Sequence, residues 1–208
     1  MVSASQSTAG SQRGPYAGAA ERRAAIVDAA FKVFAEHGYT GGSLQKIADT
    51  VGMSQTNLLY YFRTKSELLL AVLKKRDEVA KVALPDDAEE RPFVDAILGQ
   101  ARANETIHGL IELYTVLAGE AVTQGNPGRD YISQRLTELR CEFTGRFREL
   151  ADAGRLKPGI APDAAAASLI GMWDGLQLQW LLDPRAIDVV ECLRLYLDQI
   201  VLAEASED

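Results

Sequence analysis

Hydrophobic residues recur every three or four positions along most of this 208-residue chain, a spacing that places them on one face of an α-helix. No segment alternates apolar and polar residues in the manner of a half-buried β-strand. Glycine and proline residues fall between the periodic segments, where they end or begin helices. The pattern predicts an all-α protein with about nine helices, at residues 22–37, 44–51, 55–62, 64–82, 92–104, 106–124, 128–153, 162–182 and 185–203.

Two short helices around a tight turn are predicted between Ser43 and Glu67. Four apolar residues share one face of the first helix: Leu44, Ile47, Ala48 and Val51. Gly52 is suited to end this helix in a left-handed conformation, and Ser54 offers an N-cap for the next one. A helix, a turn containing glycine and a second helix form the helix-turn-helix motif, whose second helix enters the major groove of DNA. The alternative is a purely structural pair, because helices around a glycine occur in any all-helical protein.

The polar residues of this segment suit contacts with DNA. Gln55, Thr56 and Asn57 form the first turn of the second helix, where a recognition helix meets base edges. Gln and Asn can bind adenine through two hydrogen bonds, and the Thr methyl group can contact that of thymine. Hydroxyl and amine groups on either side would bind phosphates, and Gln45 could also reach a base. The predicted DNA-binding residues are Ser43, Gln45, Ser54, Gln55, Thr56, Asn57, Tyr60, Tyr61 and Lys65.

From about Glu21 to Lys81 the sequence resembles the DNA-binding domain of the tetracycline-repressor (TetR) family. The resemblance rests on FAEHGY (34–39), SLQKIADTVGMSQTNLLYYF (43–62) and RTKSELLLAVL (63–73), which follow one another as they do in the family. One position departs from the pattern, since Leu59 stands where the family usually has a tyrosine that often contacts DNA. That role is either lost here or passed to Tyr60 or Tyr61.

This resemblance implies a homodimeric transcriptional regulator that binds double-stranded DNA. In the family such a protein is most often a repressor that a small apolar ligand releases from a near-palindromic operator. The resemblance divides the chain into a flexible tail (1–20), a helix-turn-helix domain (21–81) and a helical ligand-binding and dimerisation domain (82–208). The predicted helix over 64–82 would link the two domains mechanically.

The last two predicted helices, at about 162–182 and 185–203, are apolar on more than one face. The first has one stripe through Ala165, Leu169, Met172, Leu176 and Trp180, and another through Ile170, Gln177 and Leu181. The second has a stripe through Val190, Leu193, Leu197 and Ile200, with Val189 and Tyr196 beside it. Helices that are apolar on two faces are buried on two sides. They predict a dimer interface of four helices, with the core of a monomeric bundle as the alternative.

Aromatic residues beyond Val82 are candidates for a ligand pocket, which is usually apolar with a few polar groups. The predicted ligand-binding residues are Tyr114, Phe143, Trp173 and Gln177, with Phe93, Phe147 and His108 as further candidates. Aromatic residues at helical spacing more often form ordinary core, so that alternative stays open. The family resemblance is what favours a small-molecule inducer.

The net charge of −7 is unevenly distributed along the chain. From Arg13 to Lys81 eleven Lys and Arg accompany seven Asp and Glu, whereas from Val82 onward eleven accompany twenty-two. This asymmetry indicates a part that contacts DNA and an acidic part held away from the phosphates. The basic excess is small, so a rival interpretation is a ligand-binding or protein-binding dimer that keeps the motif as a scaffold and does not read DNA.

Other functional classes find little support in the sequence. No Ser or Cys has the context of a nucleophile, so we predict no enzyme activity and no catalytic residues. Cys141 and Cys192 do not form a metal-binding spacing, and we predict neither a metal site nor a cofactor. The chain lacks an apolar run of about 18 residues and its first residues lack the apolar block of a secretory signal, so we expect a cytoplasmic protein with no membrane contact.

Overall fold

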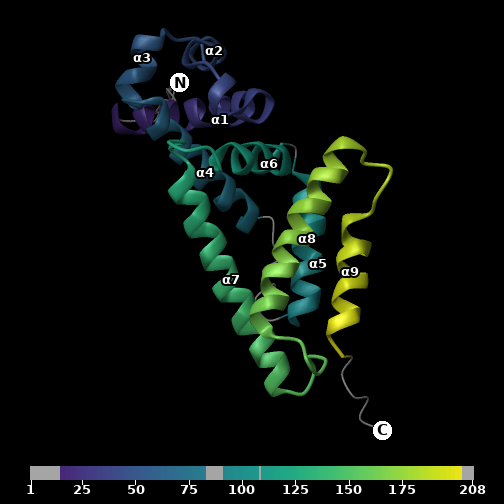
Figure 1. Cartoon of the computed structure of the whole chain (residues 1–208). Coiled ribbons are helices and arrows are strands. Elements are labelled where there is room, and N and C mark those ends of the chain that lie inside the picture. Colours follow the sequence, from purple (N-terminus) through teal and green to yellow (C-terminus); the bar gives the residue numbers. More distant parts are fainter. Residues whose placement is uncertain (1–14, 83–90, 108, 203–208) are drawn as a thin grey trace, which may run out of the picture.

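The structure, a computed structural model, describes residues 15–82, 91–107 and 109–202. Within these ranges the chain forms nine helices (Figure 1). They are α1 (Pro15–Gly41), α2 (Leu44–Thr50), α3 (Gln55–Tyr61), α4 (Lys65–Val82), α5 (Phe93–Thr106), α6 (Leu110–Ala121), α7 (Arg129–Asp152), α8 (Pro162–Leu182) and α9 (Val189–Ile200). The all-α fold predicted from the sequence is confirmed, and each predicted helix has a counterpart.

Three helices begin at some distance from the predicted residue. α1 begins at Pro15, so residues 15–20 of the predicted tail are helical, and the rest of that tail lies outside the described residues. α6 begins four residues late because Gly109, with φ of 75°, interrupts the helical path. α9 begins only at Val189, where the side chain of Asp188 caps the helix. The first residue of a helix depends on a single cap residue, and the spacing of apolar residues does not indicate where that cap lies.

Figure 1 shows α1, α2 and α3 together at one end of the molecule, above a bundle of α5, α7, α8 and α9. α4 leads from the first group toward the bundle, and α6 lies across the molecule beneath α1. α1 packs most extensively against α6 and α4, while α7 packs against α8. The helix-turn-helix is therefore held at an exposed end of the molecule, on a platform formed by α4 and α6.

The buried apolar residues form two clusters. The first joins α1–α4 to α6 and the start of α7, and it includes the fully buried Phe34, Phe62 and Leu113. The second joins α5, α7, α8 and α9, and the fully buried Phe147 belongs to it. Because Leu113 of α6 belongs to the first cluster, the helix-turn-helix shares its core with residues beyond the boundary predicted at 81 and 82. That division into domains stays a prediction.

Candidate DNA-binding surface and ligand-binding core

Each helix of the helix-turn-helix begins at a serine cap, Ser43 before α2 and Ser54 before α3. The Ser43 hydroxyl accepts the N–H of Lys46 at 3.3 Å, and the Ser54 hydroxyl accepts the N–H of Asn57 at 3.2 Å. Ser, like Asp and Asn, satisfies an otherwise unpaired N–H of the first helical turn in this way. Leu58 of α3 is fully buried, so the opposite face of this short helix is turned toward water.

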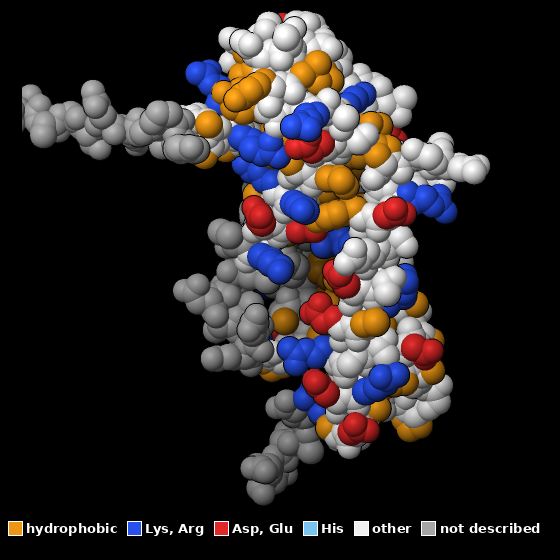
Figure 2. All heavy atoms as spheres, turned by 90° about the vertical axis from the view of Figure 1, so that its left-hand side faces the viewer, with side chains coloured by type: hydrophobic (Ala, Val, Ile, Leu, Met, Phe, Trp, Pro, Cys, Tyr) orange, Lys and Arg blue, Asp and Glu red, His pale blue; other side chains and the backbone are white. Residues whose placement is uncertain are grey.

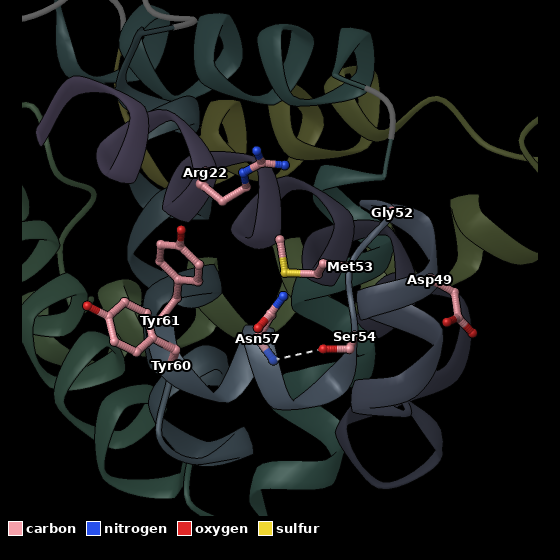
Figure 3. Close-up of a pocket in the computed structure, with 8 residues that line it drawn as sticks. All are labelled: Arg22, Asp49, Gly52, Met53, Ser54, Asn57, Tyr60 and Tyr61. Atoms are coloured by element: carbon pink, nitrogen blue, oxygen red, sulfur yellow. Dashed lines mark hydrogen bonds between the residues drawn. The ribbon is translucent and has the colours of Figure 1, made fainter. Parts of the chain in front are cut away.

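An open hollow of about 740 Å³ lies beside α3 (Figure 3). The residues that line it come from α1, α2, the turn and α3: Arg22, Asp49, Gly52, Met53, Ser54, Asn57, Tyr60 and Tyr61. In Figure 3 the ring of Tyr61 points toward Arg22, and the side chain of Met53 lies between Arg22 and Asn57. Guanidinium, amide and phenol groups are the donors that proteins offer to phosphates and bases.

Seven of the nine predicted DNA-binding residues are exposed: Ser43, Gln45, Ser54, Gln55, Thr56, Asn57 and Tyr60. Tyr60 is 85 % exposed, so its ring and hydroxyl are accessible to a partner. Gln45 donates its amide to the Asp49 carboxylate at 2.6 Å, so a DNA contact by Gln45 would compete with this bond. Four of the predicted residues, Ser54, Asn57, Tyr60 and Tyr61, share the hollow.

Lys65 lies apart from the hollow, at the start of α4. Its Nζ is 4.6 Å from the centre of the Tyr39 ring and 3.4 Å from the carbonyl oxygen of Thr40. Burial lowers the pKa of Lys65, and the negative charge of Glu120 acts in the opposite direction. The ammonium is thus engaged with the end of α1, and its predicted contact with a phosphate stays a prediction.

Sequence reasoning missed two neighbouring arginines of α1. Arg22 lines the hollow. The guanidinium of Arg23 lies over Phe62, with Cζ 3.8 Å from the ring centre, and it donates to the backbone carbonyl of Tyr61. Arg23 therefore fixes the end of α3. Both residues stood at the predicted start of a helix, where the sequence indicated solvent rather than a packed surface.

Charge on the surface follows the asymmetry of the sequence. On the face shown in Figure 2, Lys and Arg side chains predominate over Asp and Glu in the upper part, which carries the helix-turn-helix. Lower down, both signs are mixed. A basic end of this kind favours approach to the DNA backbone.

The predicted ligand-binding residues are all buried, but they belong to different parts of the core. Tyr114 is in the first cluster, whereas Phe143 and Trp173 are in the second. Phe143 packs edge-on against Phe93, with 5.6 Å between ring centres, as aromatic core residues do. Gln177 of α8 is 4 % exposed, which is rare for an amide. The assignment of these four residues to a ligand stays a prediction.

Two arginines that the sequence analysis did not single out flank Tyr114. Cζ of Arg76 lies 4.6 Å and Cζ of Arg135 lies 5.6 Å from the centre of the Tyr114 ring. Both guanidinium groups form ion pairs with the carboxylate of Asp77, with Nη1 of Arg76 and of Arg135 lying 3.0 and 2.8 Å from Oδ1. The hydroxyl of Tyr131 donates to the same carboxylate at 2.5 Å. We call these five residues the arginine cluster.

Burial governs the ionisation of the arginine cluster. It lowers the pKa of Arg76, and the like charge of Arg135 adds to this effect. It also raises the pKa of Tyr114. Asp174 of α8 faces the cluster, and burial raises the pKa of its carboxyl group while Arg76 and Arg135 oppose that shift. One signal in the sequence was available, because Arg76 follows Val72 and Leu73 on the apolar face of α4.

In the described ranges, no group of three or more His, Cys, Asp or Glu residues is placed to hold a metal ion. No helix in the same ranges is long and apolar enough to cross a membrane. Cys141 is exposed and Cys192 is half-buried, and both are free thiols. His108, a further candidate for the pocket, lies outside the described residues.

Two family models match this sequence. The model of bacterial regulatory proteins of the tetR family matches residues 26–72, which run from α1 into α4 and contain the whole helix-turn-helix. The model of the C-terminal part of BetI-type transcriptional repressors matches residues 120–202. The chain belongs to the TetR family. The resemblance inferred from the sequence is thereby confirmed, and this TetR-family protein is a DNA-binding transcriptional regulator.

Several known regulators are similar to the chain. The fatty acid metabolism regulator protein of Bacillus subtilis is 24 % identical over 187 residues, which cover 85 % of this chain and 92 % of that protein. The transcriptional repressor NicS of Pseudomonas putida is 30 % identical over 139 residues, which cover 64 % of this chain and 62 % of that protein. These relatives are transcriptional regulators and not enzymes.

Solved structures share the fold. A transcriptional regulator from Saccharomonospora viridis, in complex with choline, has a TM-score of 0.71 and 21 % identity, covering 88 % of this chain and 100 % of that one. SmeT, a repressor from Stenotrophomonas maltophilia, in complex with triclosan, has a TM-score of 0.70 and 18 % identity, covering 88 % and 93 %. The TetR-family chain therefore has the all-α architecture of these regulators.

Proposed function

We propose that this TetR-family protein is a homodimeric repressor that a small ligand releases from a near-palindromic operator. Two α3 helices, one from each protomer, would enter successive major grooves. The two-fold symmetry of a dimer requires half-site centres about one helical turn apart, roughly 34–36 Å, or a multiple of that distance. Gln55, Thr56 and Asn57 would read bases, and the residues around them would bind phosphates.

The outer face of α3 carries this proposal. Gln55, Thr56 and Asn57 are exposed on the first turn of a helix whose inner face is anchored by the fully buried Leu58. Asn57 also lines the hollow that Arg22 borders. A row of uncharged polar side chains next to a guanidinium group combines base readout with phosphate binding, as a recognition helix requires.

The dimer is supported by exposed leucines on the last two helices. Leu178 and Leu182 of α8 are 48 % and 80 % exposed, and Leu195 of α9 is 56 % exposed. On α8, a Cβ at Gly171 or Gly175 would meet no atom within 4 Å, so a second helix could approach closely. Exposed apolar side chains and small residues on adjacent helices suit an isologous four-helix interface.

These leucines differ from the stripes on which the sequence argument for a dimer relied. The residues of the α9 stripe are buried within a single chain: Val189, Val190, Leu193, Leu197 and Ile200. On α8, Ala165 and Leu169 are buried as well, while Met172, Leu176 and Trp180 are partly buried against the second cluster. We therefore place the partner on Leu178, Leu182 and Leu195.

A ligand would act by changing the distance between the two α3 helices. α4 runs without interruption from Lys65, beside α3, to Val82, and α6 contacts the end of α1. A ligand shifts such an equilibrium only by its difference in affinity for the two states, and couplings of about 1–3 kcal/mol are typical. Regulators of the same fold were solved with choline and with triclosan, which supports a small-molecule effector for this chain.

Selection from random double-stranded DNA tests the proposal. We expect the purified protein to enrich one near-palindromic sequence whose half-sites lie about 10 base pairs apart or a multiple of that. Enrichment of no sequence, with only weak salt-sensitive binding, would favour the rival interpretation in which the helix-turn-helix is a scaffold. The exposed polar face of α3 and the arginine in the hollow are the observations against that rival.

A further inference from the structure

We propose that the ligand of this regulator is an amphipathic monocarboxylate, whose carboxylate binds Arg76 and Arg135 beside Tyr114. The inference rests on the proposed function only in assuming that a small ligand binds among the helices below the helix-turn-helix. The charge of that ligand follows from the arginine cluster itself.

The charges of the cluster are not balanced by bonded partners. Its two guanidinium groups share the single carboxylate of Asp77, which also accepts the hydroxyl of Tyr131. Within the described part of the chain, Asp174 makes no ion pair with either arginine inside 4.0 Å. Arg76 is only 4 % exposed, and burying a charge is costly unless it is fully paired. Two positive charges therefore share one carboxylate in contact with them, and the carboxyl group of Asp174 faces both arginines without contacting them.

Hydrogen-bond donors without partners also favour an anionic ligand. Among the described residues, the buried Nε–H groups of Arg76 and Arg135 have no acceptor, and neither has the indole N–H of Trp173. Buried polar groups in folded proteins nearly always have partners. The two orphaned groups of the arginine cluster are both donors, so a ligand that satisfies them must present acceptors.

The geometry disfavours a cationic ligand at this place. An aromatic face such as that of Tyr114 could bind a quaternary ammonium through a cation–π contact. Both guanidinium groups already lie over that ring, so an ammonium there would meet two positive charges. We therefore do not expect this cluster to bind a quaternary ammonium such as the choline in the Saccharomonospora viridis regulator.

Charge and surroundings narrow the anion to a monocarboxylate with an apolar body. Among the described residues, Asp77 is the one carboxylate in contact with the two arginines, so a ligand carboxylate would be the second. A phosphate monoester carries about −1.5 to −2 and would be repelled more strongly by Asp77 and Asp174. Carboxylates bind guanidinium groups through two parallel hydrogen bonds. Tyr114 belongs to the first apolar cluster and Trp173 to the second, so the body of the ligand would meet apolar side chains.

Matched probes with the full chain test the inference. Isothermal titration would compare straight-chain carboxylates of about four to twelve carbons, benzoate and naphthoate with their amides, trimethylammonium analogues and phosphate esters. We expect at least one carboxylate to bind ten-fold or more tightly than each of its three counterparts. If no carboxylate binds, or if any matched counterpart binds as tightly, the inference is overturned.

Variants test whether the arginine cluster causes the preference for a carboxylate. Arg135→Gln should weaken the carboxylate at least ten-fold and leave the amide unchanged, while Arg135→Lys should keep a preference for the carboxylate. Arg140→Gln is the matched control, because Arg140 is exposed on the same helix and its guanidinium donates to Thr137, one turn earlier on that helix. Circular dichroism confirms that each variant is folded before it is titrated. Equal losses in Arg135→Gln and Arg140→Gln would contradict the assignment.

DNA binding, measured separately by anisotropy, distinguishes this inference from the proposed function. If a carboxylate binds as expected but leaves the affinity for DNA unchanged, the ligand class is correct and ligand-released repression is wrong. If only neutral or cationic compounds bind and release the DNA, the proposed function holds and the carboxylate inference is wrong.

Discussion

The carboxylate of Glu120, on the last turn of α6, accepts the backbone N–H groups of Tyr39 and Thr40 at 2.5 and 3.1 Å. These two N–H groups follow Gly38, whose φ of 68° and ψ of −179° interrupt the helical path of α1. Tyr39 in turn contacts Ser66 through its hydroxyl and Lys65 through its ring. Glu120 therefore connects α6 to the end of α1 and, through Tyr39, to the start of α4.

Removing the charge of Glu120 should weaken this connection. In Glu120→Gln the amide oxygen can still accept one N–H group, but the charge-assisted bonds are lost, and we expect a cost of about 1–2 kcal/mol in the free energy of unfolding. Urea denaturation measures it. Glu142→Gln, an exposed position on α7, is the control and should change stability by less than about 0.5 kcal/mol. Equal stability of the two variants would show that the Glu120 contact contributes nothing.

Gly38 should tolerate no side chain. A Cβ there would lie 2.7 Å from Oε1 of Glu120, and the positive φ is unfavourable for any other residue. Gly38→Ala should therefore lower the free energy of unfolding by about 1–3 kcal/mol. Gly119→Ala, one residue before Glu120, is the matched control, because its Cβ would meet nothing within 4 Å. The control should be neutral or more stable by about 0.5–1 kcal/mol, since alanine favours helix.

Asn57 and Arg22 should affect DNA binding in different ways. Asn57→Ala should cost about 1–3 kcal/mol at one base position of the operator and relax the preference there. Arg22→Ala should weaken all sequences alike and lower the slope of log affinity against log salt by about one unit. Fluorescence anisotropy at several salt concentrations, with operators varied at single positions, separates the two effects.

Two further variants complete this comparison. The sequence predicts that Lys65 binds a phosphate, so Lys65→Ala should weaken all DNA sequences alike and lower the salt slope by about one unit. An unchanged salt slope would show that the ammonium stays on Tyr39 and does not bind a phosphate. Lys32→Ala, an exposed residue on α1, serves as the control for loss of one charge. Identical behaviour of Asn57→Ala and Arg22→Ala would contradict the division into base and phosphate contacts.

Asp174 should make stability depend on pH in the range above about 3.8, the ordinary pKa of its carboxyl group. Burial raises the pKa of its carboxyl group above the ordinary value of 3.8, so the folded protein binds more protons than the unfolded chain in the range just above 3.8. The free energy of unfolding therefore falls as pH rises through that range. Relative to Asp174→Asn, the wild type should gain stability as the pH is lowered from 7 to 4. Parallel urea curves for the two proteins at every pH would contradict this.

The proposed interface makes a prediction about assembly. Leu182→Glu places a charge on an 80 % exposed leucine of α8, and desolvating it between two chains would disfavour the dimer. Sedimentation should show a monomer, or a dimer at least ten-fold weaker than the wild type. Val122→Glu is the control, because Val122 is 76 % exposed but lies beyond the end of α6. A monomer in both variants, or in neither, would place the interface elsewhere.

Local patterns in the sequence predicted the helices and the helix-turn-helix because their causes lie within a few residues. The apolar stripe from Leu44 to Val51 and the cap at Ser54 are visible without any tertiary contact. The same holds for the exposure of Gln55, Thr56 and Asn57, which follows from one buried face of a seven-residue helix.

Features that join distant segments could not be predicted in this way. Glu120 and Tyr39 are 81 positions apart, and the pattern of α6 does not indicate where its last turn will lie. Arg76 stood on an apolar face of α4, but Arg135 on α7, which shares the carboxylate of Asp77 with it, looked like an ordinary solvated residue. The stripe of α9 was correctly seen as apolar, yet only the packing shows that α5 and α8 bury it within one chain.

The central claim is that two α3 helices of one dimer read a palindrome. The most direct measurement is an anisotropy titration of the full chain against its selected operator and against the same operator with one half-site scrambled, at several salt concentrations. We predict one dimer per operator, a linear salt dependence, and a loss of at least ten-fold when one half-site is scrambled. Equal affinity for the intact and the scrambled operator would contradict the claim.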